Sequence, residues 1–470
     1  MDDSVAVAQP GGWRDLLGRR YLGAATVLAG GVALYATNEF LTISLMPSAV
    51  AEIGGQRFYA WVTTVYLVGS VMSATTVSAV LLRLGPRRSY LAGLSVFGLG
   101  SLCCAVAPSM QVLLTGRAVQ GIAGGVLAGL GYAVINTALP ATLWTKASAL
   151  VSAMWGVGTL LGPAAGGLFA QFASWRWAFG ALLVMVVAMS VLVPIALPAG
   201  VGHRGVAAAP AIPVRSLLLL GAAALLVSVA GVAHAVGVTV ALAAAGFALV
   251  ALFLVVDRRM AASVLPPSAF GPGPVKWVYL TLGVLMSATL VDMYVPLFAQ
   301  RLAHLTPVAA GFLGAGLAAG WTLSEIVSAS LRRSRVIVRV VAVSPLVMAA
   351  GLAFNALTQR QDASAGQVAG WAVGLLISGA GVGLAWPHLS AWAMSKVSDP
   401  AEGPVAAAAI NTVQVMSAAL GAAVAGVVVN STDGGGATAS RLLFATFAVL
   451  VALGAVAAVR SGRPAAGRGS

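Results

Sequence analysis

The chain alternates between long apolar runs and short polar connections. The apolar runs continue for about 20 residues, whereas membrane β-strands alternate apolar and polar positions over about 10 residues. Lipid offers no hydrogen-bond partners to the backbone, so runs of this kind are expected to form membrane-spanning helices. We count fourteen runs, at residues 22–48, 60–81, 90–107, 111–139, 148–171, 177–197, 216–234, 238–256, 276–299, 308–331, 336–357, 367–393, 404–429 and 440–459.

Composition favours a membrane protein over a soluble one. The 470 residues are 60% hydrophobic and 8% charged, whereas soluble domains carry about 25% charged residues. A soluble fold of this length has too much surface to hide so much apolar material. We therefore predict an all-α integral membrane protein whose surroundings are a lipid bilayer.

The net charge of +14 raises the question of a nucleic-acid partner. The basic residues form short clusters between the apolar runs rather than a stripe interleaved with aromatic residues, so no nucleic-acid partner is expected. With the N-terminus in the cytoplasm, inside segments hold twenty Lys and Arg residues and outside loops hold five. This bias predicts a multi-pass protein of the bacterial inner membrane with both termini cytoplasmic. Twelve spans, without the runs at 216–234 and 238–256, would give the same sidedness.

The two halves of the chain are weak copies of each other. Three pairs of segments correspond, 46–47 with 295–296, 78–83 with 328–333 and 158–167 with 417–426, at offsets of 249, 250 and 259. A nearly constant offset indicates duplicated bundles with a substrate cavity between them. We predict an N-terminal six-helix bundle at 1–200, two linker helices at 201–260 and a C-terminal six-helix bundle at 261–470.

Three stretches carry specific patterns. The loop after the second run reads Ser78-Ala-Val-Leu-Leu-Arg83-Leu-Gly85-Pro-Arg87-Arg88, which predicts a tight turn at Gly85 with the arginines left in the cytoplasm. The fourth run begins Leu113-Leu-Thr-Gly-Arg117-Ala-Val-Gln120-Gly121. A cation about 10 Å inside a span needs a wet cavity or a partner, unless Arg117 snorkels to the surface.

The third stretch is Gly158-Thr-Leu-Leu-Gly162-Pro163-Ala-Ala-Gly166-Gly167 in the fifth run. Gly158, Gly162 and Gly166 are four residues apart, so they share one helix face and allow another helix to approach closely. Pro163 removes a backbone hydrogen bond and permits a kink.

Together these stretches resemble motifs of the major facilitator superfamily. Tyr294-Val-Pro296-Leu-Phe-Ala-Gln300 and Gly379-Ala-Gly381-Val-Gly383 are similar to segments of its fourteen-span drug:proton antiporter branch. The resemblance implies the major facilitator fold, with two six-helix bundles and two extra central spans. It also implies proton coupling by Arg117, antiport from the glycine-rich stretch, and conformational roles for Arg83, Gly85 and Arg87. Leu82 stands where the family has Asp, which leaves the charge link between the halves without its usual residue.

Three carboxylates lie well inside predicted spans: Glu39, Asp292 and Glu325. A charged side chain facing lipid costs at least about 2.5–3.5 kcal/mol, so these groups should face the bundle interior. Glu39 lies eight residues before Pro47 and Asp292 four before Pro296, a difference of about one helical turn, so both can line a central cavity. We predict that they couple transport to protons, while Glu325 either pairs with the Arg332 cluster or takes part in coupling.

Polar and aromatic residues of the spans are candidates for substrate binding. They are Asn38, Gln120, Trp386, His388, Asn411 and Gln414. Asn38 occupies the position at which the family usually has its acidic residue. The adjacent Cys103 and Cys104 have no neighbours at metal-ligand spacing, and the chain has no nucleophile motif or phosphate loop, so we predict no metal, no cofactor and no enzyme activity.

These features favour a monomeric, proton-coupled efflux antiporter. Its expected partners are protons and a drug-like or lipophilic small molecule, which a buried carboxylate would suit if it is cationic. Export of an endogenous metabolite or lipid remains open, because it differs only in cargo. Proton symport for uptake conflicts with the glycine-rich stretch. A receptor or scaffold would have no reason to keep buried carboxylates.

Overall fold

The protein is a bundle of long helices joined by short turns. The computed structural model describes residues 13–197, 213–233, 235–260, 262–399, 402–432 and 436–463. Within these ranges every regular element is an α-helix or a 3₁₀-helix. The termini, which we expect in the cytoplasm, lie outside the described residues.

The elements follow the predicted apolar runs closely. The first part of the chain contains α1 (Trp13–Leu16), α2 (Leu22–Ile53), η1 (Gln56–Phe58), α3 (Tyr59–Ala74), α4 (Val77–Ala105), α5 (Met110–Ala133), α6 (Ile135–Ala138), η2 (Ala141–Leu143), α7 (Trp144–Phe172) and α8 (Trp175–Ala196). The middle contains α9 (Val214–Val232), α10 (Val236–Asp257) and η3 (Pro267–Phe270). The last part contains α11 (Val275–Thr289), η4 (Leu290–Tyr294), α12 (Val295–Ala303), α13 (Pro307–Ala329), α14 (Ser334–Thr358), α15 (Ala365–Ser395), α16 (Gly403–Asn430) and α17 (Ala437–Ser461).

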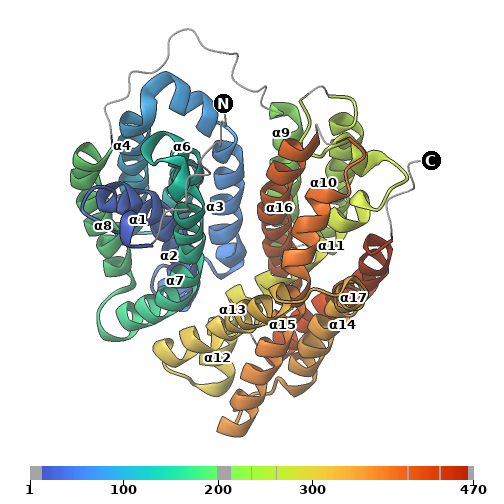
Figure 1. Cartoon of the computed structure of the whole chain (residues 1–470). Helices are drawn as coiled ribbons and strands as arrows, with labels where there is room; N and C mark the ends of the chain where they lie inside the picture. Colours follow the sequence, from blue (N-terminus) through green and yellow to red (C-terminus); the bar gives the residue numbers. More distant parts are fainter. Residues whose placement is uncertain are drawn as a thin grey trace, which may run out of the picture.

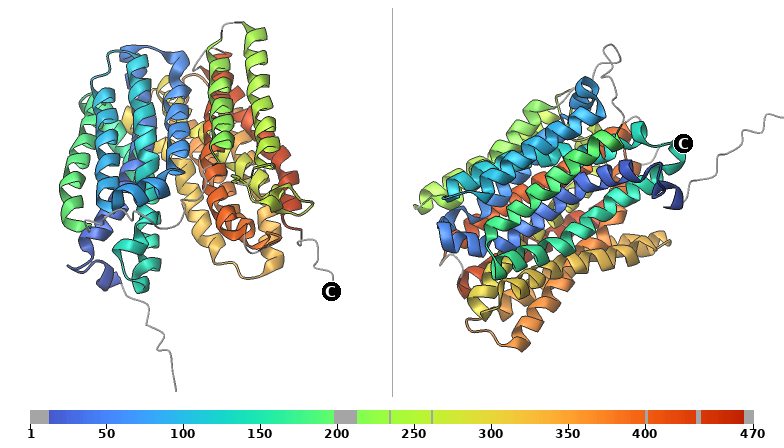
Figure 2. Two further views of the ribbon diagram at one scale, coloured as in Figure 1. Left: turned by 90° about the horizontal axis from the view of Figure 1, so that it is seen from above. Right: turned by 90° about the vertical axis from the view of Figure 1, so that its left-hand side faces the viewer.

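The helices divide into two groups that stand side by side, α2 to α8 in blue and green and α11 to α17 in yellow to red (Figure 1). Figure 2 shows the same division from above. Within the first group α2 packs on α7 and α4 packs on α5, and within the second α13 and α14 both pack on α15. We refer to these groups as the N-terminal half and the C-terminal half.

The protein has about twelve membrane spans. Eleven helices of the described chain are long and apolar enough to cross a bilayer, or twelve if the pair formed by α3 and α4, which is bent by 107°, is one span. This count does not support the predicted fourteen. It leaves out α2, where polar residues such as Asn38 and Glu39 lower the hydropathy, and it merges the runs predicted at 60–81 and 90–107. The helices α9 and α10 are each long and apolar enough to cross a bilayer on their own.

Two local breaks shape the helices around the site. Gly85 interrupts α4 with φ 73° and ψ 169°, a conformation that only glycine adopts readily, and so produces the turn expected there. The run predicted at 276–299 is broken into α11, η4 and α12. Pro296 has no N–H, so it cannot continue the α-helical hydrogen bonds back into η4, and Asp292 lies in the resulting 3₁₀ turn.

The helix α9 packs against both halves along their seam. It contacts α3 and α16, whereas α10 contacts mainly α9. Trp61 of α3 donates from Nε1 to the backbone oxygen of Ser228 over 2.9 Å. Asn430 of α16 donates to the backbone oxygens of Gly231 over 3.1 Å and Arg57 over 2.8 Å. Only 11% of the most apolar stretch of α10 is buried, so this helix is left for lipid to cover.

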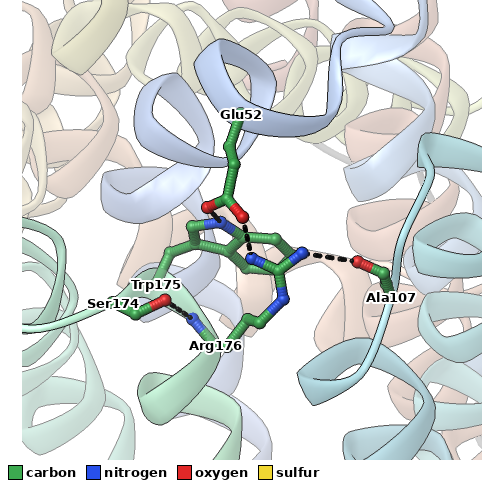
Figure 3. A network of polar contacts seen from close by, with 5 residues as sticks. All are labelled: Glu52, Ala107, Ser174, Trp175 and Arg176. Carbon is green, nitrogen blue, oxygen red and sulfur yellow. Dashed lines mark hydrogen bonds and ion pairs between the residues drawn. The ribbon is translucent and has the colours of Figure 1, made fainter.

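The two ends of the bundle are named here after the ends of α2, the Leu22 end and the Ile53 end. At the Ile53 end, one polar network holds the N-terminal half together (Figure 3). Glu52 accepts from Trp175 Nε1 over 2.7 Å and pairs with Arg176, which also donates to the backbone oxygen of Ala107 over 2.9 Å. This network joins the end of α2, the start of α8 and the turn before α5.

Candidate functional site

The two halves meet through an aromatic stack near the Ile53 end. The rings of Tyr59, at the start of α3, and Tyr294, at the end of η4, lie with centroids 4.8 Å apart and planes 19° apart. Both side chains are fully buried. Beside them, Arg301 donates to Gln56 Oε1 over 3.0 Å, again from one half to the other. The seam is therefore sealed at this end.

The glycine-rich stretch of α7 makes a second part of the seal. A Cβ placed on Gly158 would lie 2.6 Å from Ala36 Cβ, and one on Gly162 would lie 2.6 Å from Phe40 Cβ. These glycines therefore allow α2 to lie directly on α7, and Gly166 faces α2 in the same way. A Cβ on Gly167 would instead lie 2.7 Å from Val308 Cα of α13. The helix α7 thus touches its own half and the opposite one, and it continues as one helix through Pro163.

At the Leu22 end, polar contacts join residues of the same half. Lys396 donates to the backbone oxygens of Ser461 and Arg463 over 2.7 and 3.1 Å, within the C-terminal half. Lys146 lies over the ring of Trp13, within the N-terminal half. These contacts stay within one half, whereas the contacts of Tyr59, Arg301 and Gly167 at the Ile53 end cross from one half to the other.

A pocket lies just inside the sealed end, between the halves. Its accessible volume is about 10 Å³, which is room for about one water molecule in this state. Its lining residues come from α2, α7, η4, α12 and α13: Phe40, Ile43, Ser44, Pro163, Asp292, Pro296, Gly311, Gly314, Ala315 and Ala318. Asp292 is the acidic residue of this lining, and the 3₁₀ turn before Pro296 places it there.

Glu39 lies one helical turn before Ile43 of that lining and is half-buried. It is within electrostatic range of Asp292 and of Arg117. The two carboxylates proposed from the sequence therefore come from opposite halves and approach each other beside the pocket.

Arg117 is buried within the N-terminal half and does not snorkel to the surface, since only 1% of its surface is exposed. Its Nε donates to the backbone oxygen of Val62 over 3.3 Å and its Nη1 to Gln120 Oε1 over 2.9 Å. Gln120 in turn donates to Ser101 Oγ over 2.8 Å. The side chain of Gln120, a candidate substrate contact from the sequence, is thus fully buried and engaged with these two residues.

An aromatic chain that sequence reasoning missed connects Arg117 to the helix of Glu39. The guanidinium carbon lies 4.1 Å from the centroid of the Tyr66 ring. Tyr66 stacks on Tyr35, with centroids 5.4 Å apart, and its hydroxyl donates to the backbone oxygen of Tyr35 over 3.1 Å. Trp155 meets Tyr35 edge-on at 5.4 Å. Tyr35 precedes Glu39 by four residues and so shares its helix face, which is the signal that could have identified it.

A second cluster lies between α13 and α15 of the C-terminal half. The rings of Trp321 and Trp386 have centroids 5.1 Å apart and planes inclined at 57°. Trp321 donates from Nε1 to Glu325 Oε2 over 2.9 Å. His388 is buried, and its Nε2 lies 3.0 Å from Ser328 Oγ. In the described part of the chain, no ion pair joins Glu325 to the Arg332 cluster, so that expected pairing is not observed.

The remaining sequence candidates are spread over both halves. Asn38 is fully buried in α2. On α16, Asn411 is exposed and Gln414 is half-buried. Arg83 is exposed and Arg87 half-buried on either side of the Gly85 turn. Over the described residues, no group of three His, Cys, Asp or Glu side chains is arranged to hold a metal ion.

Comparison with known sequences matches the chain to a family and to curated relatives. The model of the Major Facilitator Superfamily matches residues 28–219. A probable multidrug-efflux transporter of Mycobacterium tuberculosis, in strain CDC 1551 and again in strain H37Rv, is 62% identical over 458 residues, which covers 97% of either chain. An uncharacterized MFS-type transporter of the same organism is 26% identical over 257 residues, covering 52% of this chain and 36% of the relative.

Comparison with solved structures shows the fold. A D-xylose–proton symporter superposes with a TM-score of 0.63 at 15% identity, covering 95% of this chain and 100% of the other. A nucleoside transporter superposes with a TM-score of 0.61 at 13% identity, covering 93% and 98%. At these identities the likeness concerns the arrangement of the helices.

Proposed function

The chain belongs to the major facilitator superfamily of membrane transporters, and from that premise we propose that it is a proton-coupled efflux antiporter for drug-like small molecules. The 62% identity to a probable multidrug-efflux transporter over nearly the whole length supports efflux of such cargo. The observation that carries proton coupling is the approach of Glu39 and Asp292 from opposite halves beside a pocket sealed at one end.

The proposal places the Leu22 end in the cytoplasm. The turn at Gly85 lies at this end and is flanked by Arg83, Arg87 and Arg88, and basic residues favour the cytoplasmic side of a bacterial inner membrane. The sealed Ile53 end then faces outward, so the crevice is in the state that receives cargo from the cytoplasm. Alternating access requires the seal at Tyr59, Tyr294 and Gly167 to open while the Leu22 end closes.

The finer architecture is part of the same proposal. The break at Gly85 divides α4 into two arms, and we propose that the second arm crosses the membrane separately from α3. The 32 residues of α2 extend about 48 Å, enough to cross a bilayer despite their polar centre. With α9 and α10 both spanning, we propose the fourteen-span arrangement of the drug:proton antiporter branch, two bundles of six helices with two linker helices, which is two spans more than length and hydropathy support. The protein acts as a monomer, because one crevice lies within one chain.

The transport cycle follows from competition for the crevice carboxylates. When Glu39 or Asp292 is deprotonated at the cytoplasmic-facing stage, its charge attracts cargo. After the halves rock, protons from outside neutralise the carboxylate and favour release. Arg117 lies within electrostatic range of Glu39, so a change of charge on Glu39 acts directly on Arg117.

Transport in inverted membrane vesicles tests this function. We expect wild-type protein to release protons when cargo is added. Glu39→Gln or Asp292→Asn should abolish that release, because each variant keeps the side-chain size but removes the titrating group. Glu52→Gln, in a half-exposed carboxylate of the Ile53 end, is the matched control and should retain coupling. Wild-type coupling in both crevice variants would refute the assignment.

A further inference from the structure

The carboxylate of Glu325 is not used by the transport cycle described above. It lies on α13, on the helix face that carries Gly311, Gly314 and Ala318 of the pocket lining, since these positions are separated by three, four and seven residues. Glu325 is only partly buried. It therefore faces the crevice between the halves, nearer to the Leu22 end than Asp292 is.

Two indole rings lie beside this carboxylate. Trp321 precedes Glu325 by one helical turn, and Trp386 of α15 meets Trp321 at a centroid distance of 5.1 Å. Because the planes are inclined at 57°, the rings form an open V rather than a closed stack. Both residues are half-buried, so each ring retains surface that a flat molecule could cover.

The charge of Glu325 lacks a protein counter-ion. Trp321 Nε1 donates to Oε2, and within the described ranges no cationic side chain forms an ion pair with this carboxylate. If the group served only to accept the indole hydrogen bond, a neutral amide would suffice, whereas a carboxylate at membrane depth costs several kcal/mol more. Aromatic faces attract cations, Trp most strongly, and a neighbouring carboxylate adds to that attraction.

We propose that Trp321, Glu325 and Trp386 form a capture site for planar aromatic organic cations at the cytoplasmic side of the crevice, separate from the Glu39–Asp292 pair that exchanges protons. This proposal rests on the efflux function proposed above, and it adds the chemical class of the transported molecule. A ring stacks on the exposed indole surface while its charge lies against Glu325. Cargo thus binds first at this site and moves toward the proton-exchanging pair as the halves rock.

Equilibrium binding to the full chain in nanodiscs, without any gradient, tests the site. The probes are ethidium, a planar cation, and phenanthridine, its uncharged ring system, each followed by fluorescence. Glu325→Gln keeps an acceptor for Trp321 but removes the charge, so we expect ethidium affinity to fall about tenfold and phenanthridine affinity to stay the same. Trp386→Leu should weaken both probes, because it removes the stacking surface.

Two control variants test whether a loss of ethidium binding is specific to the proposed site. Trp177→Leu alters a tryptophan that is 67% exposed on α8, and Glu52→Gln alters a carboxylate outside the crevice; both should bind ethidium as wild type does. Glu325→Gln should still release protons in inverted vesicles at saturating ethidium, whereas Glu39→Gln should not. Weakened ethidium binding with retained proton coupling in Glu325→Gln is the combination that two separate sites require.

The outcomes for the two proposals are distinguishable. Unchanged ethidium affinity in both Glu325→Gln and Trp386→Leu would overturn the capture site and leave the coupling function untouched. Equal weakening of ethidium and phenanthridine by Glu325→Gln would overturn the claim that the site selects cations. Retained proton coupling in Glu39→Gln and Asp292→Asn would instead defeat the proposed function and leave the binding result standing.

Discussion

The ring of Tyr59 lies nearly flat on the ring of Tyr294, with 4.8 Å between centroids, although the residues are more than 230 positions apart and belong to opposite halves. Neither hydroxyl has a hydrogen-bond partner in the described structure. The contact is therefore made by the rings, and it joins α3 directly to the turn that holds Asp292.

Removal of this stack should favour opening of the Ile53 end. Aromatic pairs contribute about 0.5–1.5 kcal/mol beyond their burial, so Tyr59→Ala should raise the outward-open population about two- to tenfold. The measurement is labelling of a pocket cysteine, Ser44→Cys, by an impermeant maleimide added to intact cells, with Cys103 and Cys104 replaced by Ser. Tyr59→Phe keeps the ring and should label as wild type. An equal labelling rate for Tyr59→Ala would show that the stack does not hold the seal.

A disulfide across the seam should arrest transport. A Cβ on Gly426 of α16 would lie 2.7 Å from Ala60 Cβ of α3, close to the separation a disulfide requires after a small adjustment. Oxidation of Ala60→Cys/Gly426→Cys should therefore stop transport, and a reductant should restore it.

The pair Gly23→Cys/Ala196→Cys has a similar Cβ separation, 3.0 Å, but joins α2 to α8 within the N-terminal half. Its oxidation should leave transport unchanged, because rigid-body rocking does not separate these residues. Continued transport by the fully oxidised seam pair would contradict motion about this seal.

The close packing of α7 on α2 should tolerate no added side chain at Gly162. A Cβ there would lie 2.6 Å from Phe40 Cβ and 2.9 Å from the Leu41 nitrogen, so Gly162→Val should destabilise the protein by about 1–3 kcal/mol and lower its melting temperature. Gly156→Val on the same helix is the control, because a Cβ at Gly156 meets nothing within 4 Å. Equal melting temperatures would argue against the close approach.

The charge of Arg117 should matter more than its hydrogen bonds. Arg117→Leu removes the cation near Glu39, so we expect proton release in inverted vesicles to fall at least about tenfold. Arg117→Lys keeps the charge but loses the guanidinium bonds to Val62 and Gln120, at about 1–3 kcal/mol of stability. It should therefore be less stable yet remain partly coupled. A coupled Arg117→Leu variant would assign Arg117 a structural role only.

Sequence reasoning located the individual groups of the site better than their partners. Glu39, Asp292 and Arg117 stand out because a charged residue within an apolar run is costly in lipid. The partners of Arg117 did not stand out, since Tyr66 and Val62 look like ordinary residues of an apolar run and become neighbours only through packing. For the same reason the sequence left Glu325 either paired with the Arg332 cluster or taking part in coupling, whereas the structure gives it the indole of Trp321 as a hydrogen-bond donor.

The bounds and breaks of the membrane spans show a second limit of prediction from sequence. Apolar runs are local, so most of them agree with the helices within a few residues, but α4 begins at Val77, well before the run predicted at 90–107. The turn at Gly85 could be predicted from the sequence because glycine tolerates a positive φ. The break at η4 was not expected, because Pro296 sits in an otherwise uninterrupted apolar run and its effect depends on how the backbone before it is packed.

The sequence by itself determined the helical membrane architecture and the presence of charges within the spans, since each follows from transfer of local segments between water and lipid. Only the tertiary structure decided which end of the crevice is sealed, that Glu39 and Asp292 approach each other, and that Trp321 lies between Glu325 and Trp386. These relations join residues far apart in the chain, and the close packing of whole helices, rather than the hydropathy of any one of them, fixes which side chains meet.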